Sequence, residues 1–284
     1  MKFHQDSASL FIPDGTPERE ALARITHLGI GAHQDDLEFM AFHGILACYD
    51  DKEKSFGGVT CTNGAGSART GVYAGLTDQE LQRIRHQEQE SAALIGRYGV
   101  MIQLDYASQQ IQRSPAELGD DLQAILTQST PRIVYTHNLA DKHETHVAVA
   151  LATLRAIRRL PPEQRPEQVH GCEVWRGLDW MNDEDKILHD VSGHEELASA
   201  LNAVFDSQIN GGKRYDLAIT GRRHANATLL RPHTADAAQQ VAFAMDLTPL
   251  ARNDTLDIEE YVGDFIAKFE SDVRGKIARL LGKR

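Results

Sequence analysis

The sequence has few cysteines and no long apolar run. Its 284 residues include three cysteines, Cys48, Cys61 and Cys172, which are widely spaced and form no CxxC pair. An odd number of widely spaced cysteines argues against a disulfide framework. It is typical of reduced thiols in the cytoplasm, where we expect this protein. No stretch approaches about 18 apolar residues, so we expect no transmembrane helix. Residues 1–6 also lack the apolar centre of a signal peptide.

Positive charge is scarce as well. The chain carries 30 Lys and Arg residues against 41 Asp and Glu residues, which gives a formal net charge of −11 at pH 7. Phosphate backbones and anionic lipids repel such a surface, so we expect neither nucleic acid nor a membrane as the main partner. The hydrophobic content of 41% is ordinary for a soluble globular protein, and the length suffices for one large domain.

Short apolar segments alternate with helical patterns along the first part of the chain. This alternation predicts βαβ units and an α/β fold with a largely parallel sheet. No linker is long enough to separate two units, so we expect a single domain over 1–284, with a core at about 25–160 and a C-terminal portion at 161–284. Residues 1–15 suggest an irregular lead-in, and 211–253 show no clear pattern. Strands are predicted at 25–31, 57–62, 100–104, 132–136, 171–175 and 186–191, and helices at 16–24, 39–49, 77–96, 114–130, 143–160, 195–205 and 257–281.

One imidazole and three carboxylates lie within seven residues directly after the first predicted strand of the core. Residues 32–38 read AHQDDLE and contain His33, Asp35 and Asp36, with a helix predicted behind them. Polar groups at the carboxyl end of a strand sit where open α/β sheets bind ligands. His33 and Asp36 can both bind one divalent metal, and Asp35 between them would remain available for proton transfer.

A second polar cluster, residues 136–146, follows the fourth predicted strand. It contains His143 and His146, which are three residues apart at a helix start and therefore lie near one face. One histidine from this cluster, together with His33 and Asp36, makes a three-ligand set with an open position, the usual layout of a catalytic zinc. Taken singly, a histidine there is more often a surface hydrogen-bonding group, and an acidic pair before a helix is often only a cap. Two such clusters at strand-to-helix junctions favour a shared metal site.

Residues 32–38 resemble the AHPDDxE signature of the PIG-L/LmbE-like zinc-dependent N-deacetylases. The second signature of that family is a Thr-His followed by Asp-x-His-Pro-Asp-His, which is similar to residues 136–137 and 141–146. Between the two, the Arg-x-x-Glu helix of the family resembles the segment that contains Arg85 and Glu88. The resemblance runs through most of the core in order and with matching spacing, and it does not extend into the C-terminal portion.

This resemblance implies a Rossmann-like fold and a role for each polar residue of the two clusters. Asp35 would be the general base, His143 would stabilise charge in the transition state, and Arg85 would lie near the substrate. The implied metal ligands are His33, Asp36 and His146.

The glycine-rich stretch 63–75 is expected to form a long loop at the rim of the site. Such loops often carry binding residues, which makes Asn63 at its start a candidate substrate-binding residue. An ordinary glycine loop without a binding role is an equally good reading of the same residues.

The chain departs from the family pattern in both signatures. Gln34 replaces the usual proline, which removes a backbone constraint and no ligand. Glu144 and Thr145 replace the usual Pro-Asp, and Thr145 cannot carry the charge with which an aspartate would tune the neighbouring imidazole. Asp141 and Glu144 are the candidates to take over that role.

We therefore expect a metal-dependent N-deacetylase, a hydrolase that uses zinc or another divalent ion to remove an N-acetyl group from an N-acetylglucosamine-type sugar or conjugate. Zinc would polarise the acyl oxygen, and Asp35 would activate the attacking water. The alternatives are an amidase on a thiol or other small-molecule conjugate and a metal- or sugar-binding protein without catalysis. A two-metal phosphoesterase would need more bridging carboxylates than the clusters offer. The expected partner is a small molecule, and a homo-oligomer stays open.

Overall fold

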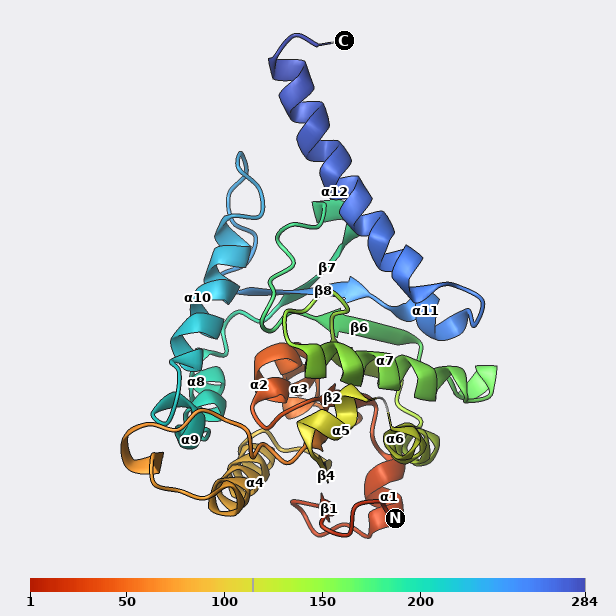
Figure 1. Cartoon of the computed structure of the whole chain (residues 1–284), viewed down its shortest axis with the longest axis vertical. Helices are drawn as coiled ribbons and strands as arrows, with labels where there is room; N and C mark the ends of the chain where they lie inside the picture. The colour runs from red at the N-terminus through yellow and green to blue at the C-terminus, as the bar shows by residue number, and fades with distance from the viewer. Residues whose placement is uncertain (114, 284) are drawn as a thin grey trace.

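A single eight-stranded sheet runs through the molecule. The computed structural model describes residues 1–113 and 115–283. Its strands are arranged in the order β1-β4-β3-β2-β5-β6-β8-β7 (Figure 1). The strands are β1 (Ser9–Phe11), β2 (His27–Gly31), β3 (Phe56–Thr62), β4 (Val100–Tyr106), β5 (Ile133–His137), β6 (Gln168–Cys172), β7 (Lys186–Asp190) and β8 (Val241–Asp246).

The sheet is parallel in its centre and antiparallel at its edges. Strands β4, β3, β2, β5 and β6 pair in parallel, whereas β1 pairs antiparallel with β4, β8 with β6, and β7 with β8. The predicted α/β class is confirmed, but the expected parallel arrangement holds only for the five central strands. The two strands that the sequence did not predict, β1 and β8, both belong to the antiparallel edges.

Helices cover both faces of the sheet (Figure 1). In β2, Leu28 and Ile30 belong to a core formed with residues of α1, α6 and α7. Gly29 faces the opposite side, where a Cβ atom would come within 2.8 Å of Phe56 and 2.9 Å of Leu37.

The longer helices are α1 (Glu18–Ala23), α3 (Phe42–Tyr49), α4 (Asp78–Ile95), α6 (Ala116–Ser129), α7 (Glu144–Arg158), α8 (Glu195–Ala203), α10 (Tyr215–Thr228) and α12 (Ile258–Leu280). The shorter ones are α2 (Asp36–Met40), α5 (Ser108–Gln112), α9 (Asp206–Ile209) and α11 (Thr248–Arg252). Single 3₁₀ turns lie at Gly71–Tyr73, Pro162–Gln164 and Asp183–Asp185.

Some of the predicted elements differ from those in the structure. The N-terminal segment 1–15 is irregular as expected except at β1 (Ser9–Phe11), where Leu10 pairs with Ile102 of β4. The single helix expected at 39–49 is two helices, α2 and α3, which meet at Ala41. The helix expected to begin at Ser114 is α6, and Ser114 itself lies outside the described residues. The capping box expected where α4 begins is present.

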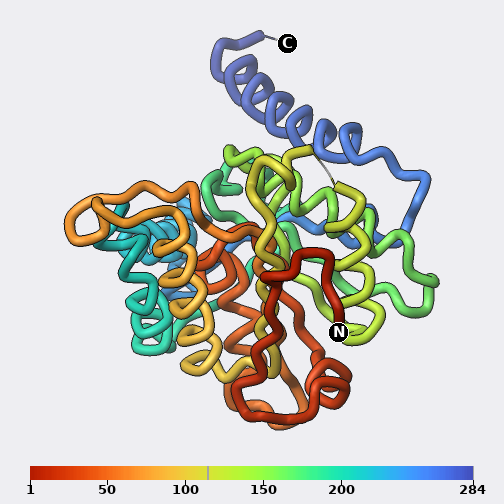
Figure 2. The backbone as a smooth tube through the Cα atoms, turned by 60° about the horizontal axis from the view of Figure 1, so that its bottom comes forward, coloured from red at the N-terminus to blue at the C-terminus, as the bar shows by residue number. Residues whose placement is uncertain are grey.

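The C-terminal portion packs against the rim loop and against α4. Glu88 in α4 accepts hydrogen bonds from the backbone N–H of Ser207 at 2.7 Å and from its hydroxyl at 2.6 Å. The N–H of Thr70 donates to the carbonyl of Gly211 at 2.7 Å. Figures 1 and 2 show the loop beside α9. Within 1–113 and 115–283, no helix combines the length and the apolar character that a membrane crossing requires.

Candidate metal centre

The two polar clusters meet at one edge of the sheet. Strands β2 and β5 are parallel neighbours, and the sheet continues from β2 to β3 on one side and from β5 to β6 on the other. The carboxyl ends of two such strands border a crevice, where open α/β sheets bind ligands. His33 follows β2, and His146 lies in the first turn of α7 after β5. The fold thus brings together two imidazoles that are 113 positions apart in the sequence.

A tight turn presents the adjacent aspartates to this crevice. Asp35 has a left-handed backbone with φ of 89° and directly precedes α2. The N–H of His33 donates to Oδ2 of Asp36 at 2.6 Å, and the N–H of Asp35 donates to the side-chain oxygen of Gln89 at 3.2 Å. A left-handed aspartate costs free energy, so the surrounding contacts must hold it in place. The turn points the two carboxylates toward different neighbours.

His33, Asp36 and His146 direct donor atoms at a common point. Nδ1 of His33 lies 3.2 Å from Nε2 of His146 and 3.3 Å from Oδ2 of Asp36, and Nε2 of His146 lies 3.5 Å from Oδ1 of Asp36. Ligands at about 2.0–2.1 Å from a tetrahedral zinc are about 3.3 Å from one another. The donor types and their spacing therefore fit a divalent metal such as zinc. His33 and Asp36 also line a pocket, which leaves that side of the set accessible.

Two further histidines flank the three donors. Nε2 of His137 accepts a hydrogen bond from the N–H of Ala32 at 2.9 Å, and its ring stacks on His146 with centroids 3.8 Å apart. The ring of His143 also stacks on the ring of His146, with centroids 4.6 Å apart, and His143 lines the pocket. The structure places His33, His143 and His146 in one possible metal-binding triad, and Asp36, His137 and His146 in another. Because the nearer nitrogen of His137 is already bonded to the backbone, His33 is the better third ligand.

The protonation states of His33 and Asp36 suit metal binding. Burial lowers the pKa of His33 to about 4, so its imidazole is neutral at pH 7, as a ligand must be. Burial alone would raise the pKa of Asp36, but His146 and His137 outweigh it and hold that pKa well below its usual range. Asp36 is therefore an anionic donor group in a buried position.

Asp141 supports His146 from behind. Its Oδ1 lies 3.6 Å from Nδ1 of His146 and accepts the N–H of His143 at 2.9 Å, while its Oδ2 accepts the N–H of Trp175 at 3.0 Å. Burial opposes ionisation, but the nearby imidazole of His146 and the hydrogen bond from the backbone N–H of His143 lower the pKa of Asp141 to about 2. A carboxylate behind a ligating imidazole orients its ring and raises its basicity. Of the two carboxylates considered from the sequence, Asp141 occupies this place.

Replacing Asp141 by Asn should weaken metal binding about 10–100-fold, because the charge behind His146 is lost while the shape is kept. Competition with a chromophoric chelator measures this affinity. Glu144→Gln is the matched control, since Glu144 lies on the exposed side of the same helix start and should leave the affinity unchanged. Equal affinities for the Asp141→Asn variant and the unmodified protein would contradict the supporting role.

Thr145 is fully buried and engaged away from the imidazoles. Its hydroxyl accepts a hydrogen bond from the side-chain amide of Gln112 in α5 at 3.0 Å. Thr145, which replaces the aspartate of the family signature, thus takes part in an uncharged contact between α5 and α7. Both Thr145 and Gln112 line the pocket.

Asp35 is held by a different set of neighbours. Its Oδ2 lies 3.8 Å from Nη2 of Arg85, and the same guanidinium donates to the carbonyls of Gln34 at 2.7 Å and of Gly64 at 3.2 Å. Burial raises the pKa of Asp35 well above its usual range, and Arg85 opposes this only in part. A carboxylate with a raised pKa is a stronger base, which suits proton transfer near neutral pH. Arg85 lines the pocket and contacts both the aspartate and the rim loop.

A pocket of about 590 Å³ opens above these residues. Trp175 and Tyr215 form part of its wall with ring centroids 6.1 Å apart, and Nζ of Lys213 lies 4.5 Å from the centre of the indole ring. None of these three residues was predicted, because they come from the C-terminal portion, where no sequence motif marks them. The lining of the pocket also includes His33, Asp35, Asp36, Arg85 and His143.

Asn63 is placed differently from the prediction. Its side-chain oxygen accepts the N–H of Ala65 at 3.2 Å and so shapes the beginning of the rim loop. Among the described residues that line the pocket, this loop is represented by Gly64, Gly66 and Ser67 and not by Asn63. Residues of this loop line the pocket as expected, but the side chain of Asn63 bonds to the backbone of the loop instead.

Comparison with known proteins agrees with this geometry. The family model described as PIG-L, GlcNAc-PI de-N-acetylase, matches residues 28–157. The resemblance that the two motifs indicate is thereby confirmed over this segment. A comparison with curated proteins gave no match.

Solved structures share the fold at low sequence identity. N,N'-diacetylchitobiose deacetylase from Pyrococcus horikoshii is 15% identical, with 87% of this chain and 92% of that chain covered and a TM-score of 0.62. The A40926 pseudoaglycone deacetylase Dbv21 is 17% identical, with 78% and 97% covered and a TM-score of 0.55. GalB, the 4-carboxy-2-hydroxymuconate hydratase from Pseudomonas putida, is 15% identical, with 78% and 96% covered and a TM-score of 0.56. Since a hydratase shares the fold, this likeness supports the architecture and leaves the reaction to the site.

Proposed function

We propose that this protein is a metal-dependent N-deacetylase that hydrolyses the acetamide of an N-acetylglucosamine-type sugar or conjugate. The observation that carries the proposal is the close approach of donor atoms of His33, Asp36 and His146, which lie 3.2 to 3.5 Å from one another, with the carboxylate of Asp35 in the same pocket. This is a metal-ligand set with a separate base, the combination that metal-assisted amide hydrolysis requires. The PIG-L match supports this choice of reaction.

In this proposal each residue has a separate task. His33, Asp36 and His146 would hold zinc or another divalent ion, which when bound polarises the acyl oxygen and eases deprotonation of water. Asp35 takes the proton from the attacking water and returns it to the departing amine. His143 donates a hydrogen bond to the oxygen that becomes negative in the transition state.

The pocket wall suits a sugar. Trp175 is 37% exposed and presents part of its indole face beside Lys213, while Tyr215 lies next to it. Aromatic faces bury the apolar side of a ring, and the polar tips of neighbouring residues can bond to its hydroxyl groups. The cavity of about 590 Å³ lies within the usual range for small-molecule sites.

The test is the release of acetate and of free amine from N-acetylglucosamine, from its simple glycosides and from N,N'-diacetylchitobiose. Activity should disappear when a strong chelator removes the metal and should return with zinc or another divalent ion. Fully active protein that is metal-free by elemental analysis would overturn the proposal. Sugar binding without turnover in the metal-loaded protein would identify a binding protein instead.

A further inference from the structure

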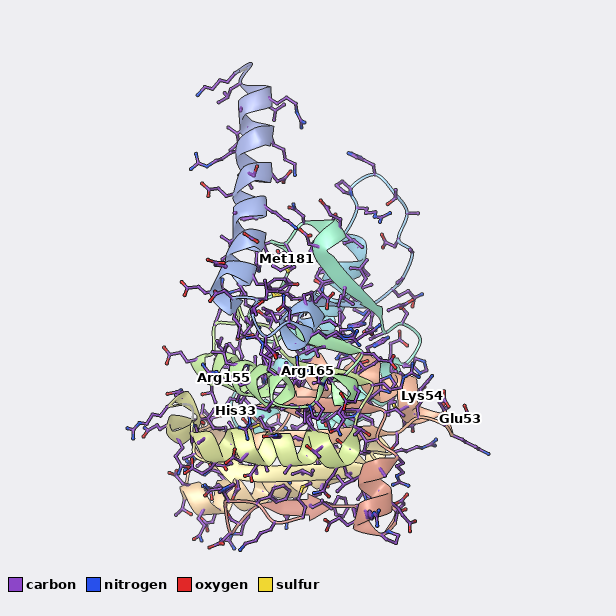
Figure 3. The ribbon with its side chains drawn as sticks, turned by 90° about the vertical axis from the view of Figure 1, so that its right-hand side faces the viewer. His33, Glu53, Lys54, Arg155, Arg165 and Met181 are labelled. Carbon is purple, nitrogen blue, oxygen red and sulfur yellow. The ribbon has the colours of Figure 1, made fainter. Side chains whose placement is uncertain are left out.

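Helix α12 stands away from the rest of the molecule along most of its length (Figures 1 and 3). Its first two turns are anchored: Phe265 is buried, and the hydroxyl of Tyr261 donates to the carbonyl of Asp246 at 2.7 Å. Phe269 still reaches Trp180, with ring centroids 6.4 Å apart. Figure 3 places His33 within the body, well below the projecting end of the helix, so this surface is separate from the candidate metal centre.

An apolar stripe continues along the projecting part of α12. Ile266, Phe269, Val273, Ile277 and Leu280 are exposed to 53%, 40%, 38%, 53% and 84%. At 3.6 residues per turn they fall within an arc of about 80°, so they form one face. Contiguous exposed apolar side chains of this kind mark an interaction surface. The contact of Phe269 with Trp180 lies at the beginning of this face.

The stripe is symmetric about Val273. Ile266 and Leu280 each lie seven positions from Val273, and Phe269 and Ile277 each lie four positions from it. A two-fold axis through Val273 would therefore place Ile266 against Leu280 of a second copy, and Phe269 against Ile277. Self-complementarity of this kind is what a two-fold symmetric interface between identical chains requires.

The charges beside the stripe have the matching pattern. Glu270 and Arg274 flank it on one side, and Asp272 and Lys276 flank it on the other, each pair forming an ion pair within the helix at 2.6 Å. If the second helix runs antiparallel, Glu270 comes beside Arg274 of the other copy, and Asp272 beside Lys276. A parallel pair in register would instead bring Glu270 beside Asp272, and Arg274 beside Lys276. The charges thus favour the antiparallel arrangement and oppose the parallel one.

We propose that α12 binds the α12 helix of a second copy of this chain in an antiparallel, two-fold symmetric pair centred on Val273. The paired segment from Ile266 to Leu280 spans about 21 Å at about 1.5 Å per residue. Such an interface is small, so we expect a dimer that dissociates in the micromolar range rather than an obligate one. The proposal concerns only this surface and holds whatever reaction the pocket catalyses.

Sedimentation of the full chain over about 1–500 µM tests the pairing. The unmodified protein should shift from monomer to dimer in this range, and Val273→Glu should raise the dissociation constant at least about 100-fold, because two carboxylates would meet at the axis without partners. A protein that remains monomeric throughout the range overturns the proposal, and so does Val273→Glu that dimerises as well as the unmodified chain.

A charge-swap experiment distinguishes self-pairing from any other use of the helix. The basic variant E270K/D272K and the acidic variant R274E/K276E should each be monomeric, since like charges would face each other. Mixed in equal amounts they should form a heterodimer, because every facing pair becomes opposite in charge. The control variant E53K/E163K makes the same charge change at exposed positions outside α12 and should dimerise normally. Failure of the mixture to associate, or binding of the unmodified monomer to anionic vesicles in place of dimerisation, contradicts the proposal.

Discussion

Replacing Asp36 by Ala should remove the metal and the activity together, whereas replacing Asp35 by Asn should keep the metal and slow the reaction. The two residues are adjacent and equally buried, but their contacts differ. Asp36 lies 3.3 Å from Nδ1 of His33 and 3.5 Å from Nε2 of His146, and Asp35 lies 3.8 Å from Arg85. Asn keeps the size and polarity of Asp35 but cannot accept a proton at neutral pH. General-base contributions are about 10²–10⁴-fold, and the loss should fall mainly on kcat.

Metal content by elemental analysis and kcat on one acetylated sugar measure both effects. Glu38→Gln is the control for neutralising a buried carboxylate nearby. Burial raises the pKa of Glu38 to about 7, and its oxygen accepts hydrogen bonds from Tyr98 at 2.7 Å and Gln89 at 2.9 Å, which an amide oxygen can still accept. This variant should retain metal and most of the rate. If Asp35→Asn loses the metal and Asp36→Ala retains it, the proposed ligand and base are reversed.

The candidate metal-binding residues could be recognised in the sequence because each cluster is local. His33, Asp35 and Asp36 lie in one turn after a strand, and His143 and His146 lie at one helix start. Parallel strands end at the same edge of a sheet, so the sequence order alone implies that such turns can meet. The structure adds the pairing of β2 with β5 that brings them together.

The pocket wall could not be predicted in the same way. Trp175 is placed by β6 and by the hydrogen bond from its N–H to Asp141, whereas Lys213 and Tyr215 follow the segment around α9, which docks onto α4 through the Glu88–Ser207 hydrogen bonds. That docking joins positions 119 residues apart and leaves no local periodicity to detect. Strand β8 was not predicted for a related reason. Its six residues carry no clear strand pattern, and the segment is a strand because it pairs with β6 and β7.

A second group of histidines lies beneath the central sheet, away from the candidate metal centre. The rings of His43 and His189 stack with centroids 4.1 Å apart, and His170 lies 4.9 Å from His189. The hydroxyl of Tyr135 lies 3.2 Å from Nδ1 of His43, and the ring of His27 lies 6.2 Å from Tyr135. These side chains come from α3, β2, β5, β6 and β7, so the group joins the central sheet to its antiparallel edge.

These histidines should make the fold sensitive to acid. Burial is the main cause that lowers the pKa of His27 and of His170 to about 4 and of His189 to about 2, and the neighbouring imidazoles lower them further. Asp246 opposes the shift at His170, and Asp51 opposes it at His27. The ordinary histidine pKa is about 6.5, so the unfolded chain binds more protons than the folded one below that pH. Their stabilising effect is complete above about pH 6.5 and is lost progressively as the pH falls toward 4.

Replacing His189 by Phe should therefore flatten the pH dependence of stability. Phe keeps the ring and its stacking on His43 but takes up no proton, so the loss of unfolding free energy between pH 7 and pH 5 should shrink by about 2 kcal/mol, the contribution of one such histidine. Urea unfolding of both proteins at the two pH values measures this, and comparing differences cancels the titration of the carboxylates. His233→Phe replaces an exposed histidine and should leave the pH dependence as it is. If the His189→Phe variant loses as much stability on acidification as the unmodified protein, the buried imidazoles are not what makes the fold acid-sensitive.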